Sequence, residues 1–301
     1  MHLPLRPSAF LIAALSFSAA SAQQLPISNQ QQLIFPIVSI GPLGEDLHFQ
    51  TSFHFQNRSN STVQGELILF GRDGSDSTAW LACAGDVLLP VPQDSLLPAT
   101  RLVVEIPAHG SLRRTGVVGS QDIALIEGWA VFSWEGEPRV EASLELALLH
   151  GNPPACMPLR DIPAEQVVTS VVLPATRASS EFPVAVVINN MRETAISVAN
   201  ASEKVAQISL VFYDASGEVT AEPTVQLEPL ERMSRLAFEW SIIGLVFAGG
   251  IVEPIRPEDF HGTVVIKSDQ PIVVGAIDVV FPVLRFLSVP IPMPLFPPFP
   301  L

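Results

Sequence analysis

The chain has 301 residues, of which 48% are hydrophobic and 15% are charged, and its formal net charge is -14 at pH 7. A disordered chain has the opposite balance, so this composition predicts a folded protein. Because 16 Lys and Arg face 30 Asp and Glu, nucleic acids and anionic membrane surfaces are disfavoured as partners, since both require clustered cations.

The first 22 residues form a predicted secretory signal peptide. One Arg precedes an apolar run from Ala9 to Phe17, and an A-x-A site ends at Ala22. This order of a basic end, an apolar segment and small residues is typical of a cleavable signal. A lipid anchor would require a Cys directly after the cleavage point, where the sequence has Gln23. We therefore expect a secreted or periplasmic protein whose mature chain begins near Gln23.

An internal duplication organises the rest of the chain. Residues 51–74 align without a gap to residues 194–217. In each copy the first part alternates apolar and polar residues, which predicts a strand with one buried face. The second part is apolar on both faces, which predicts a more central strand. We expect the two strands of each copy to form a hairpin that ends at a Gly-containing turn.

The correspondence continues along both halves of the chain. The stretch around Ile106 matches the stretch around Leu227, and residues 127–132 match residues 261–266. The first copy carries an insertion at about residues 75–102. Short strands, Pro- and Gly-rich turns and the lack of a long helical period indicate antiparallel β-sandwiches.

The sequence therefore predicts an all-β protein with two tandem antiparallel β-sandwich domains of immunoglobulin-like type. The predicted domains are residues 23–150 and 166–290, with a linker at 151–165 and a Pro-rich apolar tail at 291–301. The linker is placed where Pro and polar residues concentrate.

The order of segments resembles the tandem β-sandwich repeat modules of uncharacterised secreted bacterial proteins. A strand, an Asn-x-Ser corner, an apolar segment that ends in D-x-x-G, a G-x-[VA]-x-[IF] strand and a closing strand such as residues 286–292 carry the resemblance. It covers nearly all of the mature chain. It implies fold and compartment, and it implies no activity.

The two cysteines predict one disulfide. Cys83 lies in the insertion and Cys156 lies in the linker. In an oxidising compartment two Cys residues indicate a disulfide between them, and two unpaired thiols are the alternative.

No catalytic or metal-binding motif stands out. The His and Cys residues lack H-E-x-x-H and zinc spacing, and neither G-x-S-x-G nor S-x-x-K occurs. We therefore expect a non-enzymatic protein without catalytic residues, cofactor or metal. Carboxylates are abundant from Glu127 to Glu145, and the alternation from Arg139 to Leu149 predicts that they lie on the exposed side of a strand. A hydrolase with an unrecognised carboxylate pair stays a third alternative.

We expect a structural or interaction module whose partner is an unknown protein or glycan at the cell envelope. Trp80 lies in the insertion, where a loop on a rigid scaffold often carries binding function. A carbohydrate-binding accessory protein that uses Trp80 is therefore the main alternative. The longest apolar run after the signal, residues 240–252, is too short to span a membrane and predicts a buried helix or loop.

Three asparagines begin N-x-[ST] sequons, namely Asn57, Asn60 and Asn200. The duplication keeps Asn-x-Ser at a strand end, where short polar side chains bond the local backbone. We therefore predict that all three are turn residues, and that a bacterial host leaves them unmodified.

Overall fold

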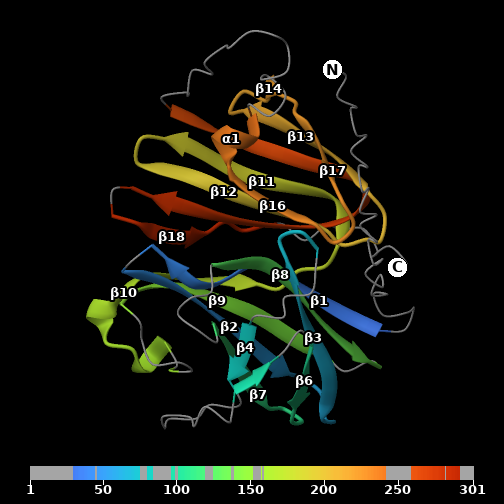
Figure 1. Ribbon diagram of the computed structural model, residues 1–301. Coiled ribbons are helices and arrows are strands. Elements are labelled where there is room, and N and C mark those ends of the chain that lie inside the picture. Colours follow the sequence, from blue (N-terminus) through green and yellow to red (C-terminus); the bar gives the residue numbers. More distant parts are fainter. Residues whose placement is uncertain are drawn as a thin grey trace, which may run out of the picture.

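A computed structural model describes residues 30–44, 46–74, 80–83, 96–98, 101–118, 125–136, 139–151, 157, 159–241, 259–281 and 283–291. Within these residues 71% lie in strands and 6% in helices. The strands form two antiparallel sheets, one drawn above the other in Figure 1. The predicted all-β class is therefore confirmed.

Ten strands form the first sheet. They are β1 (Gln30–Leu43), β2 (Leu47–Asn57), β3 (Val63–Gly71), β4 (Trp80–Cys83), β5 (Leu96–Pro98), β6 (Arg101–Ile106), β7 (Ser111–Val118), β8 (Ile126–Glu135), β9 (Val140–His150) and β10 (Val167–Pro174). The order is β5-β4-β7-β2-β1-β8-β3-β6, and β9 lies between β2 and β10. Because β10 pairs with β9, the first sheet extends past the predicted linker.

Eight strands form the second sheet. They are β11 (Ser179–Asn189), β12 (Arg192–Asn200), β13 (Ala206–Asp214), β14 (Val219–Ala221), β15 (Thr224–Leu227), β16 (Arg232–Leu236), β17 (Asp259–Val280) and β18 (Arg285–Ser288). The order is β14-β13-β17-β11-β12-β16, with β15 beside β13 and β18 beside β17.

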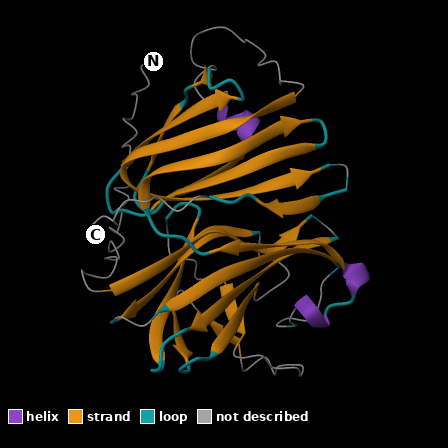
Figure 2. Cartoon of the chain, turned by 180° about the vertical axis from the view of Figure 1, so that it is seen from behind, coloured by secondary structure: helices purple, strands orange, loops and turns teal. Residues whose placement is uncertain are grey.

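Helices are short and lie at the margins of the strands (Figure 2). Two 3-10 helices, Leu159–Asp161 and Ala164–Gln166, precede β10. The helix α1 (Ala237–Ser241) contains Trp240, which is fully buried and donates its indole N–H to the Ile196 carbonyl at 3.1 Å. The predicted buried segment is confirmed at Trp240, and residues 242–252 lie outside the described part of the chain.

Two long strands change partners along their length. In β17, residues 262–268 pair with β13, and residues 272–280 pair with β12. In β1, residues up to Ile40 pair with β8, and residues 41–43 pair with β2. Each of these strands therefore belongs to two groups of strands.

The predicted hairpins are wrong. β2 pairs with β1, β7 and β9, whereas β3 pairs with β6 and β8. Likewise β12 pairs with β16 and β17 and touches β11 at one position, whereas β13 pairs with β14, β15 and β17. Alternation reports which face of a strand is buried, but it does not report the neighbouring strand.

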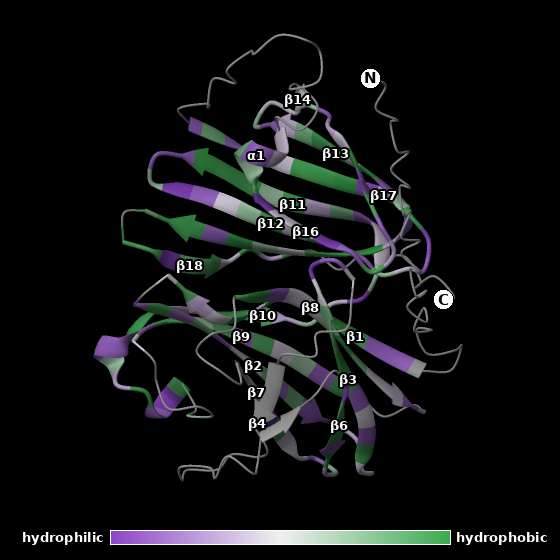
Figure 3. Ribbon diagram, in the orientation of Figure 1, coloured by the Kyte–Doolittle hydropathy of each residue, from purple (hydrophilic) through white to green (hydrophobic). Residues whose placement is uncertain are grey.

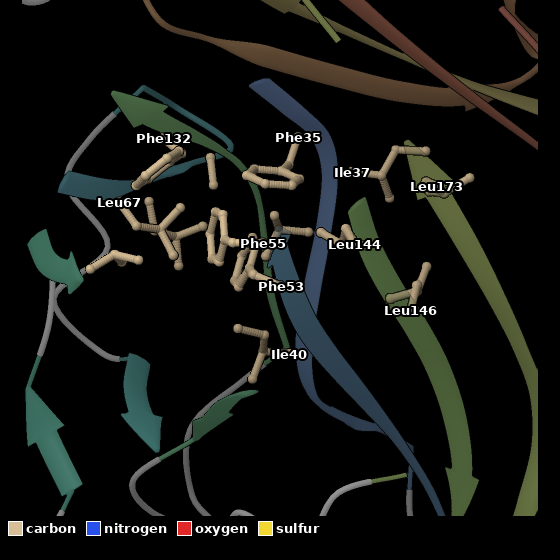
Figure 4. Packing of buried hydrophobic residues seen from close by; sticks show 14 of the residues in the cluster. Phe35, Ile37, Ile40, Phe53, Phe55, Leu67, Phe132, Leu144, Leu146 and Leu173 are labelled. Carbon is tan, nitrogen blue, oxygen red and sulfur yellow. The ribbon is translucent and has the colours of Figure 1, made fainter. Parts of the chain in front are cut away.

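Apolar side chains from β1, β2, β3, β8 and β9 meet in one core (Figure 4). Phe35 contacts Phe53 and Phe55 edge to face, with ring centroids 5.0 and 6.0 Å apart. All three rings are almost completely buried, and burial of one such side chain contributes about 1.5–3 kcal/mol. The alternation read from the sequence is what directs Phe53 and Phe55 to the same side of β2.

The two sheets share a packed junction. One apolar cluster combines side chains of the first sheet, Ile34, Ile68, Phe70, Trp129 and Val131, with Ala199, Ala201 and Val273 of the second half. We call the five first-sheet residues the junction face. The Trp129 indole donates to the Leu230 carbonyl at 2.9 Å, so the junction also carries hydrogen bonds.

Gly128 and Gly262 lie where two strands approach closely. A Cβ on Gly128 would stand 2.0 Å from the Phe70 carbonyl oxygen, and one on Gly262 would stand 2.1 Å from that of Tyr213. We expect Gly128→Ala and Gly262→Ala each to lower the free energy of unfolding by about 3 kcal/mol, because the paired strands would have to separate. Urea denaturation measures the loss.

Gly151→Ala is the matched control. Gly151 has a φ of 71° with no atom near a built Cβ, so only the backbone conformation resists the substitution. We expect a loss of about 1 kcal/mol. Equal losses in all three variants would contradict the close-approach explanation.

Candidate functional site

The first corner is organised by Asn57, at the end of β2. Its side chain is 1% exposed. The amide nitrogen donates to the carbonyl oxygens of Ser61, Ile106 and Pro107 at 2.7, 3.2 and 3.0 Å. The amide oxygen accepts from the backbone N–H and the hydroxyl of Ser59 at 2.9 and 2.6 Å. One side chain thus ties the corner to the end of β6.

The second corner repeats this arrangement at Asn200, at the end of β12. Its amide nitrogen donates to the carbonyl oxygens of Lys204, Leu227 and Glu228 at 2.7, 3.3 and 2.9 Å. The amide oxygen accepts from the backbone N–H and hydroxyl of Ser202 at 3.0 and 2.8 Å. In both corners the amide nitrogen to which a glycan would be attached is buried, and it donates its hydrogen bonds to backbone carbonyl groups.

Asn60 differs from the other two. It is exposed at the tip of the first corner, and its amide oxygen contacts Nε2 of His109 at 2.6 Å. Asn60 lies between β2 and β3 and does not bridge strands. Whether a host modifies any of the three stays a prediction.

A polar network covers the outward side of β2, β7 and β9. Strand pairing sets Ser52 beside both Thr115 and Glu145, and it sets His54 beside Arg113. The Arg113 guanidinium donates to Ser52 Oγ at 2.9 Å and to Glu145 Oε2 at 3.2 Å. The Ser52 and Thr115 hydroxyls are 2.9 Å apart. We call these five residues the polar face.

Glu145 is the electrostatic centre of the polar face. Its side chain is 20% exposed, and its Oε2 lies 3.5 Å from His54 Nε2. The hydrogen bond from His54 is the largest effect and lowers the pKa of this carboxyl group. Burial opposes it, and the charges of Arg113 and His54 lower the pKa further. Glu145 had been expected on an exposed strand face, and it is instead a half-buried member of a network.

The matching positions of the second sheet are apolar. The row formed by Ser52, Thr115 and Glu145 corresponds in pairing to Ala195, Leu236 and Ile277. Ala195 and Ile277 pack against the core of the first half. The same side of the same set of strands is thus polar in one half and part of the junction in the other.

Two buried carboxylates occur in the second sheet, Asp278 and Glu193, each 1% exposed. Asp278 accepts hydrogen bonds from Thr194 Oγ1 at 2.6 Å and from Arg192 Nε at 2.8 Å. Glu193 Oε1 accepts from the Phe238 N–H at the start of α1 at 3.2 Å. Both carboxylates are buried and accept hydrogen bonds from neighbouring groups of the protein. Neither is therefore exposed for contact with a ligand.

Arg232 is a buried cation at the junction. It is 4% exposed, its Nε donates to Ser197 Oγ at 2.7 Å, and that hydroxyl donates to the Pro36 carbonyl at 2.9 Å. Burial lowers the pKa of Arg232 to about 10, which Glu127 partly opposes. The side chain therefore stays charged at neutral pH. Through Ser197 it is linked to the Pro36 carbonyl, so this chain of hydrogen bonds joins the second half to the first.

The other residues predicted for a site lie in the insertion and in the linker. Trp80 and Cys83 bound β4, whose backbone pairs with β5 and β7, so the insertion contains strands as well as loops. Cys156 lies outside the described residues, and so do residues 75–79, 84–95 and 292–301. The Cys83–Cys156 disulfide and the ligand role of Trp80 stay predictions.

The part of the chain described here holds no group of three or more His, Cys, Asp or Glu side chains that could bind a metal ion. None of its helices is long and apolar enough to cross a membrane. No known protein family, curated protein or solved structure matches the chain.

Substitution of the corner asparagines tests their structural role. We expect Asn57→Ala and Asn200→Ala each to lower the free energy of unfolding by about 3 kcal/mol, because buried carbonyl groups lose their donor. Asn60→Ala is the matched control and should change it by less than about 0.5 kcal/mol. Chemical denaturation of the three variants decides, and a loss at Asn60 as large as at Asn57 would contradict this assignment.

The polar face predicts a pH-dependent contribution to stability. Because the folded-state pKa of Glu145 lies below its ordinary value of 4.5, the stabilisation is present above pH 4.5 and is lost as the pH falls through the folded-state pKa. We expect the stability difference between wild type and Glu145→Gln to shrink on acidification below pH 4.5.

Thermal unfolding of both proteins between pH 7 and pH 3 measures this difference. Glu141→Gln serves as control, since the exposed Arg58–Glu141 pair, at 3.3 Å, contributes less than about 1 kcal/mol. A difference for Glu145→Gln that is independent of pH would count against the network.

Proposed function

We propose that the protein is a secreted, non-enzymatic structural or interaction module. It consists of two tandem immunoglobulin-like β-sandwich units that arose by internal duplication. The matched corners at Asn57 and Asn200 are the observation that carries this proposal. Equivalent polar residues make the same five hydrogen bonds in both halves, so the conserved chemistry of the repeat serves its own backbone.

The backbone around the corners supports the duplication. Among the described residues other than Gly, positive φ occurs at His109, 54°, and at Leu230, 61°. The His109 N–H donates to the Ser59 carbonyl at 3.1 Å, and the Leu230 N–H donates to that of Ser202 at 3.3 Å. A left-handed conformation in a bulky side chain is costly, so its recurrence at aligned positions favours a common origin.

The strand pairing supports two sandwich units. In the first half, strands β1, β8, β3 and β6 pair with one another, and β7, β2, β9 and β10 form a second group. Phe35 of the first group and Phe53 of the second group meet in one core (Figure 4). In the second half, the core lies between the β11, β13 and early β17 residues and the β12 and late β17 residues. Opposed groups with a shared core are typical of a sandwich.

A rigid junction fits a spacer or adaptor better than an enzyme cleft. The junction face is covered by apolar side chains of the second half, and Arg232 adds a buried hydrogen-bonded charge. Two units fixed in this way present their far ends at a constant separation, which is useful in an envelope protein that positions a partner.

The location of the mature protein and its response to glycans test this proposal. In a bacterial host we expect the mature chain to begin at Gln23 and to be found outside the cytoplasm, by mass spectrometry of fractionated cells. Tryptophan fluorescence of the purified protein should not respond to a glycan panel. Retention in the cytoplasm with an intact signal would contradict secretion, and a glycan response that Trp80→Ala abolishes would favour the carbohydrate-binding alternative.

A further inference from the structure

Two turns at one end of the second half carry exposed apolar side chains. Met191, in the turn between β11 and β12, is 59% exposed, and Phe281 and Val283, in the turn between β17 and β18, are 36% and 62% exposed. The Phe281 N–H donates to the Met191 carbonyl at 2.7 Å, so the two turns lie side by side, at the left end of the second sheet in Figure 1. We call Met191, Phe281 and Val283 the apolar tip.

The structure behind the apolar tip holds both turns in place. The Asn189 side-chain oxygen accepts from the N–H groups of Met191 and Arg192 at 2.9 and 2.7 Å, which fixes the first turn. Leu284 packs against the core of the first half, which anchors the second turn. Figure 3 shows apolar residues at the ends of β11 and β17, which lead into the two turns. The tip is therefore exposed on anchored turns.

Two arginines stand in the row behind the apolar tip. Val280 pairs with Arg192 on one side and with Arg285 on the other. The two arginine backbones are therefore about 10 Å apart, twice the spacing of neighbouring strands. Arg285 is exposed, and the Arg192 side chain is 43% exposed. Arg192 is held at this place by Asp278, to which its Nε donates at 2.8 Å.

The carboxylates at this end lie behind or beside the arginine row. Asp278 and Glu193 are each 1% exposed and do not face solvent. Asp259 is exposed, but it pairs with Asn189 in the other group of strands and lies 2.9 Å from His261. The charges that adjoin the tip at the surface are therefore those of the two arginines.

This arrangement fits the interface of a phospholipid membrane. Apolar side chains on turns project past the strand ends, so they can enter the boundary of an acyl layer. Arginine binds phosphate oxygen atoms through parallel N–H groups and keeps its charged head in the polar layer while its stem lies along apolar groups. A row of arginines directly behind an apolar tip is thus complementary to acyl chains and to the phosphate groups above them.

A zwitterionic lipid matches the charge of the chain. With a formal net charge of -14, the protein as a whole is repelled by an anionic surface. A zwitterionic headgroup offers Arg285 a phosphate group without a net negative surface charge. Binding should therefore depend on the apolar side chains first and on the arginines second.

The matching turns of the first half are more polar. The turn between β1 and β2 contains Asp46, and the exposed His150 and Gly151 end β9 and begin the turn that follows it. The Gly151 N–H donates to the Asp46 carbonyl at 2.8 Å, so these two turns also lie side by side. The repeated fold thus brings two turns together in each half, and the second half has placed Met191, Phe281 and Val283 on them.

We propose that the apolar tip inserts into the interface of a zwitterionic phospholipid membrane, with Arg192 and Arg285 at the level of the phosphate groups. This adds a membrane-binding site to the proposed module and goes beyond its proposed function. It does not depend on the Trp80 loop or on secretion of the chain.

Flotation of the mature, full-length protein with phosphatidylcholine vesicles measures the binding. We expect a variant with Met191, Phe281 and Val283 all replaced by Ser to bind about tenfold more weakly, the ratio that a loss of about 1.4 kcal/mol gives. Val103→Ser, at an exposed residue of β6, is the matched control and should bind as the wild type does. The melting temperature of the triple variant should match that of the wild type, which separates lost binding from lost folding.

Arg285→Gln tests the phosphate contact. It is preferred to a change of Arg192, because removal of Arg192 would leave the buried Asp278 without this partner and would disturb folding. We expect about threefold weaker binding to the same vesicles, since one charge-assisted contact at an exposed site is lost. Unchanged binding of Arg285→Gln would overturn the placement of the arginines.

An environment-sensitive fluorescent amino acid at position 283 gives a second measurement. Its emission should shift to the blue when vesicles are added, whereas the same probe at position 103 should not respond. Equal binding of the triple variant and the wild type, or a silent probe at position 283, would overturn the proposal. A blue shift that grows with protein concentration in the absence of vesicles would also overturn it, in favour of a second copy as the occupant.

Discussion

At two corners of this protein the chain passes from one group of strands to another and buries carbonyl groups that no strand ladder can pair. A buried carbonyl without a donor costs about 1–3 kcal/mol, so these corners need a donor that comes with the local sequence. The amides of Asn57 and Asn200 supply it, and each simultaneously accepts from the serine two residues later. The Asn57 amide also bonds the last residue of β6, and the Asn200 amide bonds the last residue of β15. One side chain in each half thus helps to fix the position of a strand that lies far away in the sequence.

The sequence was sufficient for the all-β class and for the importance of the corners, because both depend on local patterns. It was not sufficient for strand partners. The alternation in residues 51–57 predicted the buried side of β2 correctly, yet β2 and β3 lie in different groups of strands and do not form a hairpin. The same limit applies to β10, which follows the predicted linker but completes the first sheet.

The polar face shows why sites are harder to predict than strands. Residues 51–57 alternate apolar and polar, so Ser52 and His54 lie on one side of β2, and the pairing agrees with this alternation. Their link to Arg113 joins strands far apart in sequence, and it emerges only from the register. Arg232 gave no sequence signal at all, because its burial results from contact between the two halves.

Pro183 pairs with Val265 of β17, and as a proline it leaves the other edge of β11 without a backbone N–H at this position. At the matching place in β1, Ile34 exchanges two backbone hydrogen bonds of 2.8 Å with Thr176. A proline has no N–H group, so β11 cannot form this bridge with any incoming strand. An unpaired strand edge can pair with another chain and so lead to aggregation, and a proline on the edge opposes such pairing. Among the described residues, β17 is the strand that pairs with β11 at residue 183, so we expect Pro183 to oppose aggregation at the other edge.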